Sequence, residues 1–361
     1  MTRGMTRGSA RGTSRGDLDK AYDVLVIGAG PAGSCAAIRA AQAGRSVLVV
    51  DRSGFERRRV GEHLSGLALG PLAQLGWFPE DHPHIARAVT AIRSLWGAGE
   101  VVERRALHDP YGFGFAVERP AFERSLHRLA CAQGAAVLTR TRFLRRQATT
   151  GVIRVTLSTT EGPRIVHARR LVDASGRSAT LARGRAYQTD RMICCHFLAR
   201  FTAAVHDPMA MIVEAQRDGW WYALGRPGAD NGAPQAVAGF FSDAQAYRRS
   251  GLSPGGWVRA QLAQSTLLRG RLEPASITEA QLCSSGSRVH QGADARAVSI
   301  GDAHQVFDPL SQLGLAKAIC SSDGPEFNLS RYLEARGTIY AQGAQRWSAP
   351  FWSARAPSAI A

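Results

Sequence analysis

The sequence lacks long apolar runs, an apolar segment near its first residues and metal-type cysteine spacings, and each absence argues against a class of protein. Its 361 residues contain no stretch of eighteen uninterrupted apolar residues, so a membrane-spanning helix is not expected. The N-terminus has no apolar core of a secretory signal, and we therefore expect a cytoplasmic protein. The six cysteines show no CxxC spacing and no paired histidine cluster accompanies them, so we expect no metal site.

Lysine is almost absent as well. Lys20 and Lys317 are the only lysines, and arginine supplies the other 43 basic residues. Against 29 acidic residues this gives a formal charge of +16, which favours an acidic partner. The alternative is a charge scattered over a solvated surface, because the only dense basic run is Arg57–Arg59. We do not expect a nucleic-acid partner.

The order of apolar runs and helical patterns predicts an α/β protein in which a Rossmann-like domain is interrupted by a mostly β domain. Helical periodicity extends over residues 120–133 and 257–268, and short apolar runs typical of strands lie between them. We expect a disordered Arg/Gly-rich tail at 1–20, a cofactor-binding domain formed by 21–87, 116–185 and 286–325, a substrate domain formed by 88–115 and 186–285, and a C-terminal segment at 326–361.

One βαβ unit opens the predicted cofactor-binding domain. The run Asp23–Ile27 reads as a buried strand, Ser34–Ala43 as a helix, and Ser46–Val50 as a second strand that ends at Asp51. Between the first strand and the helix, residues 28–33 match G-x-G-x-x-G. In such a loop Gly28 permits the turn, Gly30 lets a pyrophosphate approach the backbone, and Gly33 lets helix and strand pack closely.

This loop can serve either NAD or FAD, and a later segment favours the flavin. Residues 300–303, Ile-Gly-Asp-Ala, follow a late strand, and Asp308-Pro309-Leu310-Ser311 and Gly314 open a helix. A carboxylate at Asp302 can accept ribityl hydroxyls, while backbone amides at a helix start offset negative charge on a flavin ring. A plain charged turn is the alternative for this segment.

With these motifs, the chain resembles the FAD-dependent monooxygenases and flavin-dependent halogenases that share the p-hydroxybenzoate-hydroxylase-like, GR2-type fold. The likeness rests on residues 28–33, 172–177, 301–302 and 308–311. Three further segments, 61–65, 218–222 and 346–352, look like the flavoprotein monooxygenases that hydroxylate a tryptophan in a partner polypeptide during tryptophylquinone maturation.

The resemblance implies FAD as cofactor, with NADH, NADPH or a separate reductase left open as electron source. The implied FAD-binding residues are Gly28, Gly30, Gly33, Asp51, Arg119, Gly301, Asp302, Pro309 and Gly314. Arg119 could instead be a surface cap of the helix that follows it.

Catalytic and substrate-binding candidates come from two short stretches. Glu62 and His63 are the candidates for proton handling, because histidine titrates near neutrality and burial can tune a glutamate. A helix-start carboxylate beside a packed histidine is the alternative. His304 and Asp308 are second candidates for the same role. Trp220, Trp221 and Tyr222 are expected to line the substrate face by stacking, although three aromatic residues on a strand can equally be core.

The resemblance is incomplete in two places. Flavin halogenases use a lysine beside the channel to the substrate and a tryptophan motif that ends in Ile-Pro. This chain has no lysine between residues 21 and 316, and its Gly219-Trp220-Trp221-Tyr222 continues into Ala-Leu-Gly. The segment after Lys317 also looks too short for the family's next helix, which leaves the packing of the C-terminus open.

We therefore expect an FAD-dependent monooxygenase that hydroxylates an aromatic ring through a flavin C4a-hydroperoxide. In the sharpest form of this expectation, the ring is a tryptophan in an acidic partner polypeptide. The alternatives are a flavin-dependent reductase acting on an alkene, a halogenase acting on a small molecule, and an FAD-binding protein that has lost catalysis.

Overall fold

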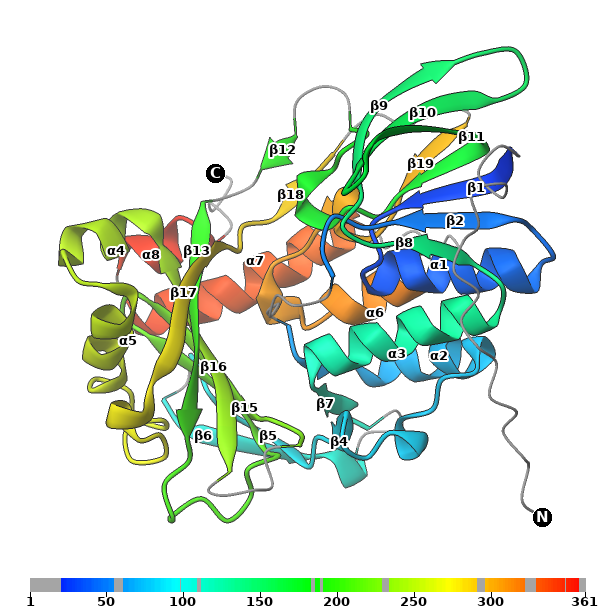
Figure 1. The fold of residues 1–361 in the computed structure, drawn as a ribbon. Coiled ribbons are helices and arrows are strands. Elements are labelled where there is room, and N and C mark those ends of the chain that lie inside the picture. Colours follow the sequence, from blue (N-terminus) through cyan, green and yellow to red (C-terminus); the bar gives the residue numbers. More distant parts are fainter. Residues whose placement is uncertain are drawn as a thin grey trace, which may run out of the picture.

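The computed structural model describes residues 21–54, 61–97, 99–108, 112–182, 186–188, 191–228, 234–290, 296–321, 329–347 and 349–356, with only the backbone of 329–335. The predicted tail at 1–20 and the arginine run at 57–59 lie outside these residues. Two large sheets organise the rest (Figure 1).

The first sheet has the order β8-β2-β1-β11-β10-β9, with β19 also paired to β11. Five of its strands are parallel, as expected for apolar runs buried on both faces. These are β1 (Tyr22–Ile27), β2 (Val47–Val50), β8 (Ala136–Leu138), β11 (Gly162–Asp173) and β19 (Ala297–Ser299). The first half of β11 forms an antiparallel meander with β10 (Ile153–Thr159) and β9 (Arg142–Ala148).

Alternate residues of β1 face two different layers. Val24 and Val26 pack against four helices, α1 (Pro31–Gln42), α2 (Leu69–Leu75), α3 (Arg119–Ala132) and α6 (Gly314–Cys320). Leu25 and Ile27 pack instead against the meander. In Figure 1 the four helices lie together beneath the sheet.

The second sheet has the order β17-β13-β16-β15-β14-β5-β6. Its strands are β17 (Thr278–Ser284), β13 (Met192–Arg200), β16 (Gln235–Asp243), β15 (Gly219–Gly225), β14 (Met211–Gln216), β5 (Ala91–Leu95) and β6 (Val101–Arg105). The helix α5 (Pro254–Leu262) covers one face, next to α4 (Ala244–Ser250). The other face packs against α7 (Leu329–Arg346) and α8 (Pro350–Ser353).

Two small sheets lie beside the large ones. One contains β3 (His63–Leu64), β7 (Phe115–Val117) and β4 (Ala86–Ala88). The other contains β12 (Tyr187–Gln188), β18 (Arg288–Val289) and β20 (Gln305–Val306). The predicted fold class, a Rossmann-like α/β unit joined to a mostly β unit, is confirmed.

Two expectations about helices are wrong. The helix predicted over 257–268 spans Pro254–Leu262, because Ser253 caps its start and Pro254 occupies its first position. After Leu262 the backbone amides of Thr266 and Leu267 donate to the buried carboxylate of Glu214, 2.5 and 3.0 Å away, instead of continuing the helix.

The second correction concerns the C-terminus, where the sequence suggested a curtailed helix. The structure has the 18-residue helix α7, and α8 follows it. Trp352 is fully buried, and its Nε1 donates to the backbone oxygens of Gln216 and Arg217, 3.0 and 3.1 Å away. The described parts of α7 and α8 therefore contribute to the core on this face of the second sheet.

Candidate functional site

Two glycines of the loop between β1 and α1, Gly28 and Gly33, are packed too closely for a side chain. Gly28 has φ +104°, and a Cβ built there would overlap the backbone oxygen of Ala174 at the end of β11. A Cβ on Gly33 would overlap the backbone oxygen of Gly28. Since Gly30 precedes α1 and has no side chain, the first amides of α1 are left for an anionic ligand, with the positive end of the helix dipole behind them.

Asp51 connects the end of β2 to this loop. Its side chain is buried, and Oδ2 accepts a hydrogen bond from the amide of Ala29 at 2.7 Å. Its Oδ1 accepts from the amide and hydroxyl of Ser53, at 2.8 and 2.7 Å. Each carboxylate oxygen can accept more than one hydrogen bond, so Asp51 can also accept from a ribose hydroxyl.

The turn that contains Asp302 lies close to the same loop, although it is distant in sequence. Gly301 packs so closely that a Cβ there would lie 2.9 Å from Cβ of Ala32, the second residue of α1. One oxygen of Asp302 lies 2.9 Å from Nζ of Lys317, and the other lies 3.9 Å from Nε of Arg177. Burial alone would raise the pKa of Asp302, but Lys317 and Arg177 outweigh it and lower the pKa, so Asp302 is a carboxylate.

Sequence reasoning assigned no role to Lys317 or Arg177. Lys317 lies on α6 with 3% of its surface exposed, and it also donates to the backbone oxygen of Gln305. Arg177 donates to the backbone oxygen of Ser284 on β17 at 2.6 Å. The one available signal was that Lys317 is the only lysine among the described residues of an arginine-rich chain.

Arg119 lies between the Asp302 turn and the loop that contains Glu62 and His63. Its Nη1 donates to the backbone oxygen of Gly61 at 2.7 Å, and its Nη2 pairs with Glu123 at 2.6 Å. Its charge also contributes to lowering the pKa of Asp302. The guanidinium is therefore buried between the Asp302 turn and the loop that contains Glu62 and His63, and it does not act as a surface cap.

His63 is held in one tautomer. Its Nε2 lies 2.5 Å from the backbone oxygen of Phe113, and a carbonyl oxygen can only accept, so Nε2 has the proton. Burial lowers the pKa of His63, and the Phe113 carbonyl opposes this only in part. Its Nδ1 is buried with no hydrogen-bond partner within the described part of the chain, so it presents a proton-accepting lone pair.

Glu62 is buried beside His63. One of its carboxyl oxygens lies 3.0 Å from the amide of Gly61, and its backbone oxygen accepts from Val117 on β7 at 2.7 Å. The charge of Glu62 also affects Tyr222 on β15. Burial first, and then Glu62 and Cys194, raise the pKa of Tyr222 well above 10.0. The structure therefore brings Glu62, His63 and Tyr222 into one neighbourhood, with Tyr222 as a neutral phenol.

The three predicted aromatic residues do not share one face. On β15, Trp220 and Tyr222 point towards the cluster that contains Phe113, while Trp221 points towards α5 on the opposite face. There Nε1 of Trp221 donates to Oε1 of Gln216 at 2.6 Å. Strand alternation causes this split, and a single cavity cannot take all three side chains.

Trp220 and Tyr222 each present a polar atom without a partner. Trp220 stacks on Phe241 with ring centroids 3.9 Å apart and an interplanar angle of 8°. Its Nε1 and the hydroxyl of Tyr222 are buried with no hydrogen-bond partner among the described residues. Unsatisfied buried donors are costly, and a ligand that hydrogen-bonds to them would remove that cost.

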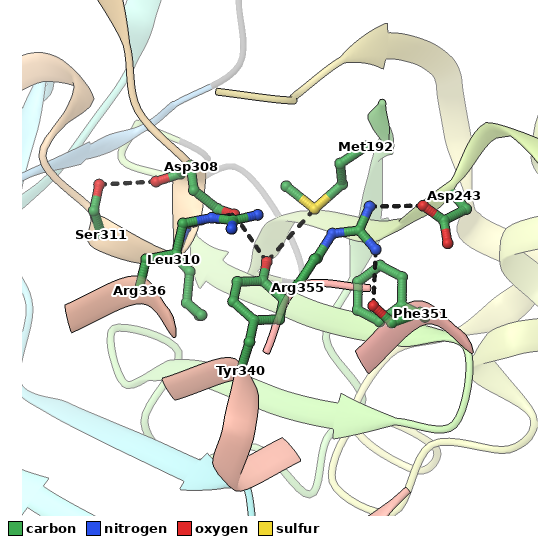
Figure 2. Close-up of polar contacts among 9 residues, drawn as sticks. All are labelled: Met192, Asp243, Asp308, Leu310, Ser311, Arg336, Tyr340, Phe351 and Arg355. Carbon is green, nitrogen blue, oxygen red and sulfur yellow. Dashed lines mark hydrogen bonds and ion pairs between the residues drawn. The ribbon is translucent and has the colours of Figure 1, made fainter. Parts of the chain in front are cut away.

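Asp308 and His304, the second candidates for proton handling, lie in different surroundings. The buried carboxylate of Asp308 accepts from the hydroxyl of Tyr340 at 2.9 Å and pairs with Nε of Arg336 at 3.0 Å, as Figure 2 shows. Its other oxygen accepts from the amide of Leu310 at 2.9 Å. The side chain of His304 is exposed. Asp308 thus joins α7 to the short turn at Pro309 that leads to Gly314, the first residue of α6.

These residues fit an FAD. The glycine cradle with its uncapped helix start suits a pyrophosphate, and Asp51 and Asp302 offer carboxylate oxygens to hydroxyl groups on either side of it. Within the described residues, no group of three or more His, Cys, Asp or Glu side chains could hold a metal ion. No helix among those residues is long and apolar enough to cross a membrane.

Comparison with known proteins agrees with this fit. Residues 23–194 match the family described as FAD dependent oxidoreductase. Over 171 residues the chain is 33% identical to menaquinone reductase of Mycobacterium tuberculosis, covering 46% of this chain and 40% of that protein. It is 27% identical over 319 residues to digeranylgeranylglycerophospholipid reductase 1 of Methanopyrus kandleri, covering 82% and 77%. The chain thus spans about two fifths of the length of the menaquinone reductase.

Solved structures resemble the whole chain. The myxobacterial chondrochloren halogenase CndH, described as FAD-dependent, superposes with a TM-score of 0.77 at 21% identity, covering 94% of this chain and 87% of that one. The peptidyl tryptophan dihydroxylase QhpG superposes with a TM-score of 0.72 at 23% identity, covering 93% and 79%. At these identities the likeness is one of fold.

Proposed function

Because residues 23–194 match the FAD dependent oxidoreductase family and nearly the whole chain is similar in fold to a flavin halogenase and a peptidyl tryptophan dihydroxylase, we propose that this protein is an FAD-dependent monooxygenase that hydroxylates an aromatic ring. The ring we propose is the indole of a tryptophan in an acidic partner polypeptide. FAD, when bound and reduced, supplies the activation of oxygen for transfer to the ring.

One observation carries the proposal: unpartnered polar atoms on the face of β15 that packs towards β7, and on β3, which pairs with β7. Nε1 of Trp220, the hydroxyl of Tyr222 and Nδ1 of His63 are all buried without partners in the described part of the chain. Phe113, which fixes the His63 tautomer, packs in the same cluster as Trp220 and Tyr222. This combination suits a planar substrate that contains both an apolar ring and a polar group.

Each of the residues around this face has its own role in the proposed reaction. Trp220 and Tyr222 orient the ring, and the hydroxyl of Tyr222 donates to a polar atom of the substrate. Hydroxylation replaces a ring hydrogen, and Nδ1 of His63 accepts the proton that the ring loses. Arg119 holds the backbone of Gly61 and thereby positions the loop that contains Glu62 and His63. The core formed by β13, β15 and α7 excludes water from this face.

A reductase acting on a quinone or an isoprenoid alkene is the second candidate. The named relatives favour it, since the sequence is similar to a menaquinone reductase and to a digeranylgeranylglycerophospholipid reductase. Such a substrate needs a long apolar tunnel, whereas the face described here has buried polar atoms. We therefore place the monooxygenase first.

The test is turnover of the FAD-loaded protein with reductant, oxygen and a tryptophan-containing acidic peptide, followed by mass spectrometry of the peptide. We expect addition of whole oxygen atoms, with a rate about tenfold lower in Tyr222→Phe, the cost of one lost hydrogen bond. Tyr247→Phe is the matched control, because Tyr247 lies on α4 against Trp257 on the opposite face. Reduction of a carbon–carbon double bond in an isoprenoid, with no oxygen added to any aromatic substrate, would establish the reductase instead.

A further inference from the structure

Two cysteines on neighbouring strands of the second sheet lie directly opposite each other. In the antiparallel pair β13–β17, Cys194 is in register with Cys283. Directly opposed residues have Cα atoms about 4.5 or 5.5 Å apart and side chains on the same face. Both separations fall in the range that a disulfide requires, about 4.4–6.8 Å.

The two thiols also shift each other's pKa. The thiol of Cys194 hydrogen-bonds to Cys283, and this contact is the main reason that the pKa of Cys283 is lowered from 9.0 to about 7. Ser285 Oγ, 3.9 Å from Cys283 Sγ, and the charge of Arg177 lower it further. The lowered pKa increases the thiolate fraction of Cys283 at neutral pH, and thiolates are the reactive form.

The two positions differ in access. Cys283 is half-buried on β17, the edge strand of the sheet, so a small oxidant can reach it. Cys194 is fully buried, and burial first and then the contact with Cys283 raise the pKa of Cys194 well above 9.0. This is the arrangement of an attacking thiol with a resolving thiol beside it.

We propose that Cys194 and Cys283 form a reversible disulfide when the protein meets a peroxide. In the first step the sulfur of Cys283 attacks hydrogen peroxide, the O–O bond breaks, and Cys283 sulfenic acid and water are formed. In the second step the sulfur of Cys194 attacks the Cys283 sulfur, the S–O bond breaks, and a second water is released. Two thiols are oxidised and one peroxide is reduced to two waters, so the sequence balances.

The pair is connected to the proposed cofactor site. Ser284, next to Cys283, accepts the hydrogen bond from Arg177, and Arg177 lies 3.9 Å from Asp302. A covalent link between β13 and β17 therefore acts on the strand that holds Arg177. The disulfide itself requires only the cysteine geometry and a peroxide, so it does not depend on the proposed function.

The test is peroxide treatment of the reduced full-length protein, alkylation of the remaining thiols, tryptic digestion and mass spectrometry. A Cys195→Ser background removes the neighbouring cysteine, whose side chain points to the opposite face and whose pKa burial raises to about 12. We expect loss of two free thiols and a cross-link between peptides 192–200 and 272–288, half-maximal in rate near pH 7 and reversed by dithiothreitol.

Two variants provide the controls. Cys283→Ser should abolish the cross-link, whereas Cys131→Ser should leave it intact, because Cys131 is also partly buried but has a histidine rather than a thiol as neighbour. The proposal is overturned if Cys283 accumulates as sulfinic or sulfonic acid with Cys194 still alkylated. It is equally overturned if Cys131 is oxidised while Cys194 and Cys283 both remain thiols.

Discussion

The most informative single residue is His63, because its two nitrogens have different roles. Nε2 donates to the backbone of Phe113, which leaves Nδ1 as a buried acceptor. The direction of its pKa shift makes the assignment testable. A base with a lowered pKa works down to a pH below 6.5, the ordinary histidine value, and is protonated only below that.

We predict that the pH profile of kcat/KM has its acid limb below pH 6.5 and that His63→Gln removes this limb and lowers kcat about a hundredfold. Glutamine retains the donor to Phe113 but lacks a basic nitrogen. The exposed His84→Gln is the control. An unchanged acid limb in His63→Gln would remove His63 from the proton-handling role.

The same shift has a consequence for stability. The unfolded chain binds a proton to His63 more readily than the folded chain does, so the contribution of His63 is complete above about pH 6.5 and is lost as the pH falls towards the folded pKa. Chemical denaturation of the wild type should show this loss in acid. His63→Gln should show a shallower dependence over the same window.

The glycine loop gives a second prediction at the scale of one residue. Gly33→Ala places a methyl group onto the backbone oxygen of Gly28, and such overpacking costs about 1–3 kcal/mol. We expect the Kd for FAD to rise about tenfold to a hundredfold, measured by fluorescence titration. Gly70→Ala on α2, where a Cβ would meet nothing within 4 Å, should leave FAD binding unchanged. Normal FAD binding by Gly33→Ala would contradict the placement of the pyrophosphate.

At the scale of elements, α7 is held by a buried ion pair. Asp308 is 1% exposed and pairs with Arg336, while Tyr340 donates to the same carboxylate (Figure 2). Removing one partner of a buried pair costs more than removing a neutral hydrogen bond, because it leaves an uncompensated charge.

We predict that Arg336→Met lowers the free energy of unfolding by about 3–5 kcal/mol and Tyr340→Phe by about 1–2 kcal/mol. Chemical denaturation measures both. Gln345→Ala, at an exposed position of the same helix, should be within about 0.5 kcal/mol of the wild type. If Tyr340→Phe proves as costly as Arg336→Met, the ion pair is not what holds α7.

Elements also show what could be predicted from the sequence. The βαβ unit and its loop were predictable because all their determinants lie within thirty residues of Gly28. Trp221 was grouped with Trp220 and Tyr222 although strand alternation alone separates them. Lys317 and Arg177 were missed because they come close to their partner, Asp302, only in the folded chain. The assignments of Glu62, His63 and the FAD-binding residues remain predictions.

At the scale of the whole molecule, the charge of +16 bears on the choice of partner. A positive surface accelerates encounter with an acidic polypeptide, and salt screens that attraction. For a tryptophan-containing acidic peptide, we predict that kcat/KM falls about tenfold or more between low and high ionic strength. A neutral peptide of the same length should show little change. Equal salt dependence for both peptides would argue against an acidic partner.

The central claim is that the protein transfers oxygen to an aromatic ring by means of FAD. The most direct measurement mixes the reduced, FAD-loaded protein with isotopically heavy oxygen gas and a tryptophan-containing peptide, and then determines the mass of the peptide. Our account predicts heavy oxygen in the indole ring of the peptide. An unchanged peptide, together with transfer of the flavin electrons to a quinone or an isoprenoid alkene, would contradict it.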